Sequence, residues 1–219
     1  MSGGRNKHLE LYRQELGALL DSEHVNEEQV HQFLTRTPIL LPLIWPLYNR
    51  VFSKLRLGNQ HVTDFAFARL TTCGVQWYFI ELEHPRHPLF NRSGDPSAKL
   101  SHGLRQINDW ESWFRQHINY VEHTLPFQKS MRESGLYTDV ELMLVIGRRE
   151  LLTDDQRQRL RTMVKPNQSI MTYDRLVDES GAGCFPQFTV DCCSFAGGTT
   201  ETLGSVVPAP GAVPCFEER

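Results

Sequence analysis

The fold of this 219-residue chain is decided by two neighbouring stretches, Val62–Ala68 (VTDFAFA) and Gln76–Glu83 (QWYFIELE). The first alternates between apolar and other residues, and the second is rich in aromatic and branched side chains, a composition typical of β-strands. A short linker that contains Cys73 and Gly74 separates them. The two stretches therefore predict an antiparallel hairpin.

The position of the turn decides which residues of this hairpin face each other. If the turn centres between Thr72 and Cys73, Asp64 lies directly opposite Glu81. If the centre lies one residue later, Asp64 lies opposite Glu83 instead. Because side chains alternate between the two faces of a strand, Glu81 and Glu83 share a face. Either register gathers acidic side chains on one face of the hairpin.

Helical patterns precede and follow the hairpin. Apolar residues at helical spacing predict a helix over residues 8–21 and a second helix that starts after Asn26, a favourable N-cap residue, and ends near Pro38. After a loop with several prolines, Asp95-Pro96 has the composition of the N-cap and first residue of a long helix. We expect the helices that precede and follow the hairpin in the chain to flank the sheet.

The second half of the chain predicts a crossover unit. Residues 140–146 have the apolar composition of a buried strand, residues 153–163 a polar helical pattern, and residues 170–173 that of a short strand. The resulting architecture is α/β, with a mixed sheet flanked by helices. We expect a helical extension over residues 1–24, one domain over residues 25–178 and an irregular tail over residues 179–219.

The tail is set apart by its composition. It is rich in Gly, Ser, Thr, Cys and Pro and shows no periodicity, which predicts a disordered or loosely ordered segment. The abrupt change near Glu179 is also compatible with a truncated or frame-shifted gene product. The tail carries five acids and one base, so a chain of net charge -3 has a nearly neutral body. Global charge therefore gives no indication of a nucleic-acid partner.

Composition also bounds the class of protein. The hydrophobic fraction of 40% and charged fraction of 22% are ordinary for a globular protein. The strongest apolar run, residues 39–45, is interrupted by Pro42 and is far shorter than the roughly 20 residues that a bilayer helix needs. The N-terminus lacks a signal-peptide pattern, and four of the five cysteines lie in the tail. We expect a cytoplasmic protein with no membrane association and no disulfide framework.

The acidic face of the hairpin is the candidate site. Carboxylates from two neighbouring strands can hold a hard divalent cation, which explains why like charges would face each other. Asp64 taken alone also fits a solvated acid. Glu81 follows an apolar run, so its carboxylate needs a partner, and a metal ion or a structural salt bridge would each provide one.

Several short motifs around these acids resemble one protein family. They occur in chain order as Gln32-Phe33-Leu34 with Pro38, Asp64-Phe65, Ile80–Pro85, Ser93–Ala98, Gln106–Trp110, Val145–Arg149 and Thr172–Leu176. Their order and spacing are similar to those of the Shedu anti-phage nuclease family, a branch of the PD-(D/E)xK superfamily. The resemblance covers roughly residues 25 to 178 and stops where the composition changes.

The resemblance implies a restriction-endonuclease-like fold and a set of site residues. Asp64, Glu81 and the carbonyl oxygen of Leu82 would hold Mg2+ or Mn2+, and Gln106 would lie near the scissile phosphate, although alone it reads as a helix-surface amide. Glu83 stands where the superfamily has a catalytic lysine, and could bind a second ion or act as general base.

Other residues could complete the site. The missing positive charge could come from Lys99 or Arg86, and a further carboxylate from Glu28. Arg148 and Arg149 could contact a phosphate backbone, or they could belong to a solvated surface.

The predicted function is a Mg2+-dependent endonuclease that hydrolyses DNA in anti-phage defence. The alternative is a catalytically inactive nuclease-fold domain that binds or senses nucleic acid. His84 and His87 lack a second pair at zinc-binding spacing and are interpreted as loop residues. The sequence leaves open whether the chain forms a homo-oligomer.

Overall fold

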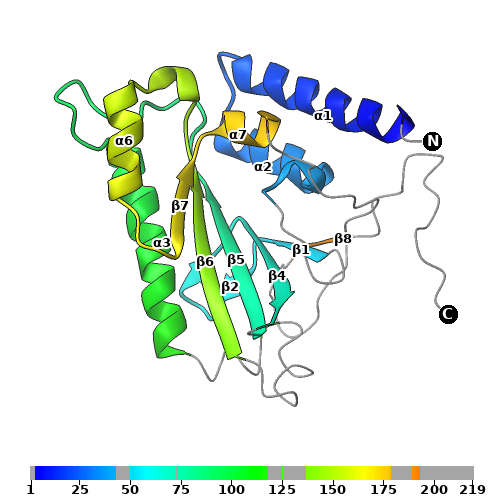
Figure 1. The fold of residues 1–219 in the computed structure, drawn as a ribbon, viewed down its shortest axis with the longest axis vertical. Coiled ribbons are helices and arrows are strands. Elements are labelled where there is room, and N and C mark those ends of the chain that lie inside the picture. The colour runs from blue at the N-terminus through cyan, green and yellow to red at the C-terminus, as the bar shows by residue number, and fades with distance from the viewer. Residues whose placement is uncertain are drawn as a thin grey trace.

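The computed structural model describes residues 3–42, 50–72, 74–117, 125, 137–178 and 189–192. These residues form a mixed α/β structure around a six-stranded sheet with strand order β7-β6-β5-β4-β1-β8. Figure 1 shows the long strands β4, β5 and β6 side by side in the centre. None of the helices within these ranges has the length and apolar character required to cross a membrane.

The strands of the main sheet differ in length and direction. The antiparallel pairs are β1 with β4 and β4 with β5, whereas β5, β6 and β7 run parallel, as do β1 and β8. A separate two-stranded sheet pairs β2 with β3. The strand bounds are Arg50–Ser53 (β1), Arg56–Leu57 (β2), His61–Val62 (β3), Phe65–Thr71 (β4), Gly74–Leu82 (β5), Tyr137–Val145 (β6), Gln168–Met171 (β7) and Thr189–Cys192 (β8).

The central hairpin has the first of the two predicted registers. β4 and β5 pair from Phe65 with Ile80 to Thr71 with Gly74, so the turn centres between positions 72 and 73. The prediction of an antiparallel hairpin is confirmed. Continued by one residue beyond the strand end, this register sets Asp64 opposite Glu81.

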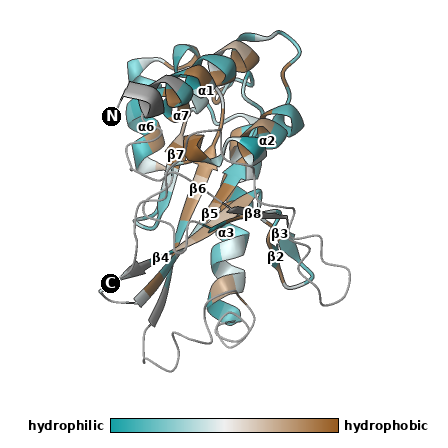
Figure 2. Cartoon of the chain, turned by 90° about the vertical axis from the view of Figure 1, so that its right-hand side faces the viewer, coloured by the Kyte–Doolittle hydropathy of each residue, from teal (hydrophilic) through white to brown (hydrophobic). Residues whose placement is uncertain are grey.

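Helices cover both faces of the sheet. The bounds of the α-helices are Gly3–Asp21 (α1), Glu27–Arg36 (α2), Ala98–Gln116 (α3), Asp154–Thr162 (α6) and Tyr173–Asp178 (α7). One apolar cluster joins the sheet to α3 and α6, and a second joins it to α1, α2 and α7. Figure 2 shows the hydrophobic residues concentrated on the strands between these layers, as expected for a core formed by sheet faces.

The odd-numbered residues of β5 face α3. Trp77 and Phe79 belong to the cluster on the α3 side, and Tyr78 and Ile80 belong to the cluster on the α2 side. Position 81 therefore points to the α3 side, because side chains alternate along a strand.

Local capping explains where the helices start. Asn26 caps α2 as predicted: its side chain accepts from the Gln29 N–H, and the Gln29 side chain accepts from the Asn26 N–H. The predicted start of α3 at Asp95-Pro96 is wrong. Ser97 is the N-cap, because its Oγ accepts from the Leu100 N–H at 3.2 Å, whereas Asp95 pairs with Asn91 inside the preceding loop.

The crossover prediction is confirmed. β6 and β7 are parallel and α6, which starts after a Thr153 capping box, connects them. The last predicted strand is displaced by two residues: β7 ends at Met171, and Tyr173 begins α7.

Part of the tail departs from its prediction. Residues Thr189–Cys192 form β8, which adds a parallel edge strand to β1, so these four residues are not irregular as expected. The backbone pairing supplies partners for an otherwise exposed strand edge. The predictions for residues 179–188 and 193–219 lie outside the described residues.

Candidate functional site

Two buried carboxylates lie where β4 begins and β5 ends. Asp64 and Glu81 are both almost fully buried, and Glu81 is only 6% exposed. Asp64 donates its backbone N–H to the Ile80 carbonyl at 3.2 Å, which fixes the two strands at this point. The opposed acids that the sequence predicted are therefore brought together on the side of the sheet that faces α3.

Asp64 is held by two donors. Its Oδ1 forms an ion pair with Nζ of Lys54, and its Oδ2 accepts from the Leu82 N–H at 2.7 Å. Lys54 lies in the turn between β1 and β2, and its own N–H donates to the Asp64 carbonyl at 2.9 Å. The carboxylate is thus oriented by side-chain and backbone groups together.

Glu81 has no comparable partner. No hydrogen bond or ion pair to its carboxyl group is found among the residues that the structure describes. Burial raises the pKa of Glu81 to about 10, and the neighbouring carboxylates of Asp64, Glu27 and Glu83 raise it in the same direction. Lys54 acts against this rise but does not offset it. A cation beside Glu81 would favour its charged form.

Glu83 is buried and carries two partners from the start of α3. Nζ of Lys99 lies 2.9 Å from its Oε2, and Nδ1 of His102 lies 2.7 Å from its Oε1. Its backbone is fixed as well, because its carbonyl accepts from the Tyr173 hydroxyl at 2.8 Å. Lys99, one of the two residues predicted to supply positive charge, therefore lies at the site.

Close approach of α3 to the sheet makes these contacts feasible. A Cβ at Gly103 would lie 2.6 Å from Cδ1 of Leu144 and 3.3 Å from Cγ of Glu83. Any larger residue at this position would force the Leu144 side chain to shift. The helix can thus bring Lys99 and His102 onto Glu83.

On α2, Glu27 joins the predicted Glu28 near the acid pair, and the charge of Glu28 acts on Lys54 and His31. The pKa of Glu27 is raised by burial and then by Asp64 and Glu83, so it belongs to the same electrostatic environment. Glu28 also accepts a hydrogen bond from Gln32 one turn further along the helix.

A buried histidine supports the Asp64 backbone. Nε2 of His31 lies 3.2 Å from Oγ of Ser53 and 3.4 Å from the Asp64 carbonyl oxygen, and its ring stacks on Phe65. Burial lowers the pKa of His31, and the charge of Lys54 lowers it further.

Sequence reasoning missed four of these residues, Lys54, Glu27, His31 and His102. Helical spacing offered one signal, because His102 follows Lys99 by three residues and shares its side of α3.

Two other predicted residues, Gln106 and Arg86, make no hydrogen bond or ion pair with the acid pair within the described part of the chain. Gln106 is half-buried one turn beyond His102 on α3, on the same side of that helix. Arg86 donates to the Asp21 carbonyl at 3.1 Å, at the end of α1. Its guanidinium is thus directed to the N-terminal helix, and it does not supply the charge near Glu83.

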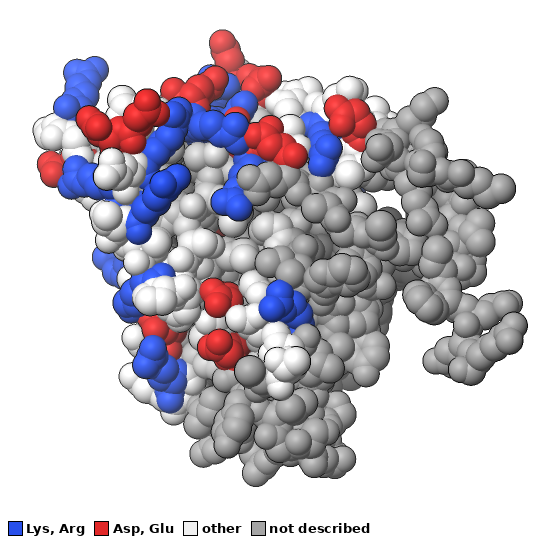
Figure 3. All heavy atoms as spheres, viewed as in Figure 1, with Lys and Arg blue, Asp and Glu red and all other residues white. Residues whose placement is uncertain are grey.

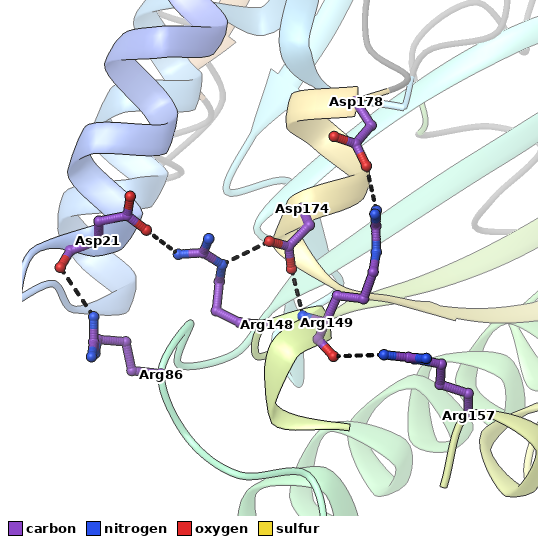
Figure 4. Close-up of polar contacts among 7 residues, drawn as sticks. All are labelled: Asp21, Arg86, Arg148, Arg149, Arg157, Asp174 and Asp178. Atoms are coloured by element: carbon purple, nitrogen blue, oxygen red, sulfur yellow. Dashed lines mark hydrogen bonds and ion pairs between the residues drawn. The ribbon is translucent and has the colours of Figure 1, made fainter. Parts of the chain in front are cut away.

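The two arginines predicted to contact nucleic acid belong to an ion-pair network (Figure 4). Arg148 is largely buried and contacts Asp21 at 2.8 Å and Asp174 at 2.9 Å, and Arg149 pairs with Asp178. These contacts join α1 and α7 to the end of β6. On the face drawn in Figure 3, acidic and basic side chains are intermixed along the upper edge of the molecule and form no patch of one sign.

The charge pattern indicates where a divalent cation would fit. Within the described ranges, no group of three or more His, Cys, Asp or Glu residues is arranged to hold a metal ion. Lysine ammonium groups stand beside Asp64 and Glu83, whereas Glu81, opposite Asp64 and two residues before Glu83, has no such partner among the described residues. Its carboxylate, with Asp64 and the Leu82 carbonyl, offers the oxygen donors that Mg2+ prefers.

Comparison with models of protein families identifies the family of this chain. The family model described as Shedu protein SduA, C-terminal, matches residues 24–177, which is more than half of the chain. The chain belongs to this family. The match to the Shedu family starts after α1 and ends before β8, so both lie outside it. A comparison with curated proteins finds no match.

Proposed function

We propose that this Shedu-family chain is a metal-dependent endonuclease that hydrolyses phosphodiester bonds in DNA, in the setting of anti-phage defence. Membership of the family supports the defence setting. The mixed sheet, with acids at the start of β4 and the end of β5 and a covering helix α3, supports a restriction-endonuclease-like fold of the PD-(D/E)xK type.

One observation carries the proposal. Glu81 is a buried carboxylate without a hydrogen-bond partner in the described part of the chain, and it lies opposite a second buried carboxylate, Asp64. Such an arrangement lowers the stability of a protein that has no cation to place there. We infer that stability is given up here because the acids hold a divalent ion.

The residues of the chain have separate tasks in this proposal. Asp64, Glu81 and the Leu82 carbonyl would hold the cation, and the Leu82 N–H keeps the Asp64 carboxylate oriented. A bound Mg2+ or Mn2+ stabilises charge on the phosphate in the transition state and acidifies an attacking water. Glu83 contacts Lys99 and His102 and would anchor Lys99 beside the cation.

Replacement of Glu81 by Gln tests the proposal. We expect wild-type protein to cleave plasmid or single-stranded DNA with Mg2+ or Mn2+ and not with chelator, and E81Q to lose at least about 100-fold of this activity. This loss is at least as large as the cost of altering an outer-shell partner of a metal site. Glutamine keeps the shape of the side chain and removes the negative ligand.

Glu111 provides the matched control. It is also a buried carboxylate, but it pairs with Arg115 and Lys165 at the far end of α3. E111Q should cleave DNA like the wild type, even if it is less stable. Equal cleavage by E81Q and wild type would remove the catalytic assignment.

A second candidate function is a nuclease-fold domain that binds or senses nucleic acid without turnover. It is favoured by the presence of Glu83 where a catalytic lysine is expected and by the ammonium groups that already neutralise Asp64 and Glu83. Calorimetry with Mn2+ separates the two functions. DNA binding without metal binding or cleavage would favour the sensing domain.

A further inference from the structure

Two lysines flank the acid pair from different elements. Lys54, in the β1–β2 turn, contacts Asp64, and Lys99, in the first turn of α3, contacts Glu83. Each side chain is nearly half exposed, at 45% for Lys54 and 43% for Lys99, although each carboxylate is buried. The two ammonium groups therefore lie at the surface, each in contact with a buried carboxylate.

Lys54 occupies this place at a conformational cost. Its φ of 54° is the one positive φ of a non-glycine residue within the described ranges. A left-handed backbone is unfavourable for a residue with a side chain, and such strain gathers at functional sites. A glycine would remove the strain, but it would also remove the ammonium group. We infer that the ammonium group of Lys54 has a role that offsets the backbone strain of this turn.

The position of Lys99 is fixed by the start of α3. Ser97 caps α3 immediately before it, and Gly103 allows the helix to lie close against Glu83. The ammonium group of a lysine has donors left over after one contact, and the Lys99 side chain is 43% exposed. Glu83 holds the group without burying it.

Both lysines act on the same space. Lys54 contacts Asp64, the carboxylate opposite Glu81, and Lys99 contacts Glu83, which lies two residues beyond Glu81 on the same face, so each ammonium group lies beside a neighbour of Glu81. Paired positive groups on either side of a metal-binding pair suit a ligand with successive negative charges. A sugar-phosphate backbone has such charges at regular intervals.

We propose that Lys54 and Lys99 form a two-lysine clamp that holds the phosphates of a DNA strand on the two sides of Glu81. The clamp rests on the proposed function, since DNA is taken as the polymer that enters the site. It assigns nucleic-acid binding to these lysines in place of Arg148 and Arg149, which are engaged in the network below α1.

Salt-dependent DNA binding by the full chain tests the clamp without reference to cleavage. The probes are fluorescein-labelled DNA, as a short duplex and as a single strand, and fluorescence anisotropy is measured in chelator over a range of salt concentrations. Loss of one phosphate contact should reduce the slope of log affinity against log salt by about 0.7 to 0.9. K54M and K99M should each show this reduction, their double variant about twice as much, and K54R none.

A second variant separates the contact from local repulsion. K54M leaves the Asp64 carboxylate unpaired, which would itself repel DNA or disturb the fold. K54M/D64N removes both charges, so the local net charge is kept. The slope should remain reduced in this variant, and its melting temperature shows whether it is folded.

Lys165 is the matched control for both lysines. It is 52% exposed and pairs with the buried Glu111, which lies 12 residues, or about 18 Å, along α3 from Lys99. K165M should keep the wild-type slope. An equal reduction in K165M, an unchanged slope in K54M/K99M, or a wild type that binds neither probe would overturn the clamp.

The outcomes for the clamp and for the nuclease are distinguishable. Reduced slopes without any cleavage by the wild type leave the clamp in place and refute the nuclease proposal. Cleavage that depends on Glu81 together with unchanged slopes refutes the clamp alone.

Discussion

The protein contains two clusters of carboxylates whose pKa values are shifted in opposite directions. Around the acid pair, burial and neighbouring acids raise the pKa of Glu81 to about 10 and also raise that of Glu27. In the network of Figure 4, burial acts to raise the pKa of Asp174, but the Arg149 N–H and the Arg148 guanidinium outweigh it and the pKa is lowered.

The difference lies in the supply of positive groups. Asp174 has a backbone donor and an arginine, so its negative charge is compensated within the chain. Glu81 has no such contact in the described part of the chain, and Lys54 and Lys99 act on it only through longer-range attraction. The network of Figure 4 fastens α1 and α7 to the sheet. The acid pair keeps an uncompensated acid, Glu81, to which a cation can bind. Three changes would break or sharpen this contrast.

The largest expected effect is that of a divalent cation on stability. With Mn2+ at about 100 times its dissociation constant, the melting temperature of the wild type should rise by roughly 5–10 °C, because the ion binds the folded state selectively. In E81Q this rise should be absent. Differential scanning fluorimetry with and without chelator measures both.

The metal-free proteins provide the internal control. Burial and the neighbouring carboxylates raise the pKa of Glu81 and so favour its neutral form when no cation is bound, and glutamine is a neutral group of the same shape. E81Q in chelator should therefore melt close to the wild type. A melting temperature that rises equally in both proteins would place the ion elsewhere.

The next largest effect is expected in the network. R148M removes two charged contacts of a largely buried side chain and leaves Asp174 and Asp21 without it, so it should lower the free energy of unfolding by about 2–3 kcal/mol. Urea denaturation measures this loss. R157M breaks an exposed pair on α6 and an exposed 3.3 Å hydrogen bond to the Arg149 carbonyl at the edge of the network, and should change stability by less than about 1 kcal/mol. If the two variants lose equally little, the network does not fasten α1.

The smallest effect concerns pH. The pKa of Asp174 lies below its ordinary value of 3.8, so the folded state binds this proton less readily than the unfolded state does. Its stabilising contribution is complete above 3.8 and is lost as the pH falls through the lowered pKa. D174N should therefore be about 1–2 kcal/mol less stable than wild type at neutral pH, and the difference should shrink below pH 3.8.

Urea midpoints of D174N and the wild type at several pH values check this dependence. A difference that stays constant down to the lowest pH would mean that the carboxylate charge of Asp174 is not what stabilises the network.

The hairpin and the cap of α2 could be predicted from sequence because they depend on neighbours in the chain. The sequence left two registers of the hairpin open, and the structure has the one that sets Asp64 opposite Glu81, whereas Asn26 caps α2 with a residue three positions away. The start of α3 was misplaced because Asp95-Pro96 and Ser97 both offer capping chemistry. The pairing of Asp95 with Asn91 in the loop settled the choice.

The sequence by itself determined that two acids face each other at the end of a buried hairpin, because strand alternation and turn length are local rules. Only the tertiary structure decided which charges surround them. Lys54, Glu27 and Lys99 come from a turn and two helices that are distant in the chain, and the docking of these elements on the sheet sets their contacts. The same docking engaged Arg148 with aspartates of α1 and α7, because ion pairs between elements depend on how the layers pack and not on spacing along the chain.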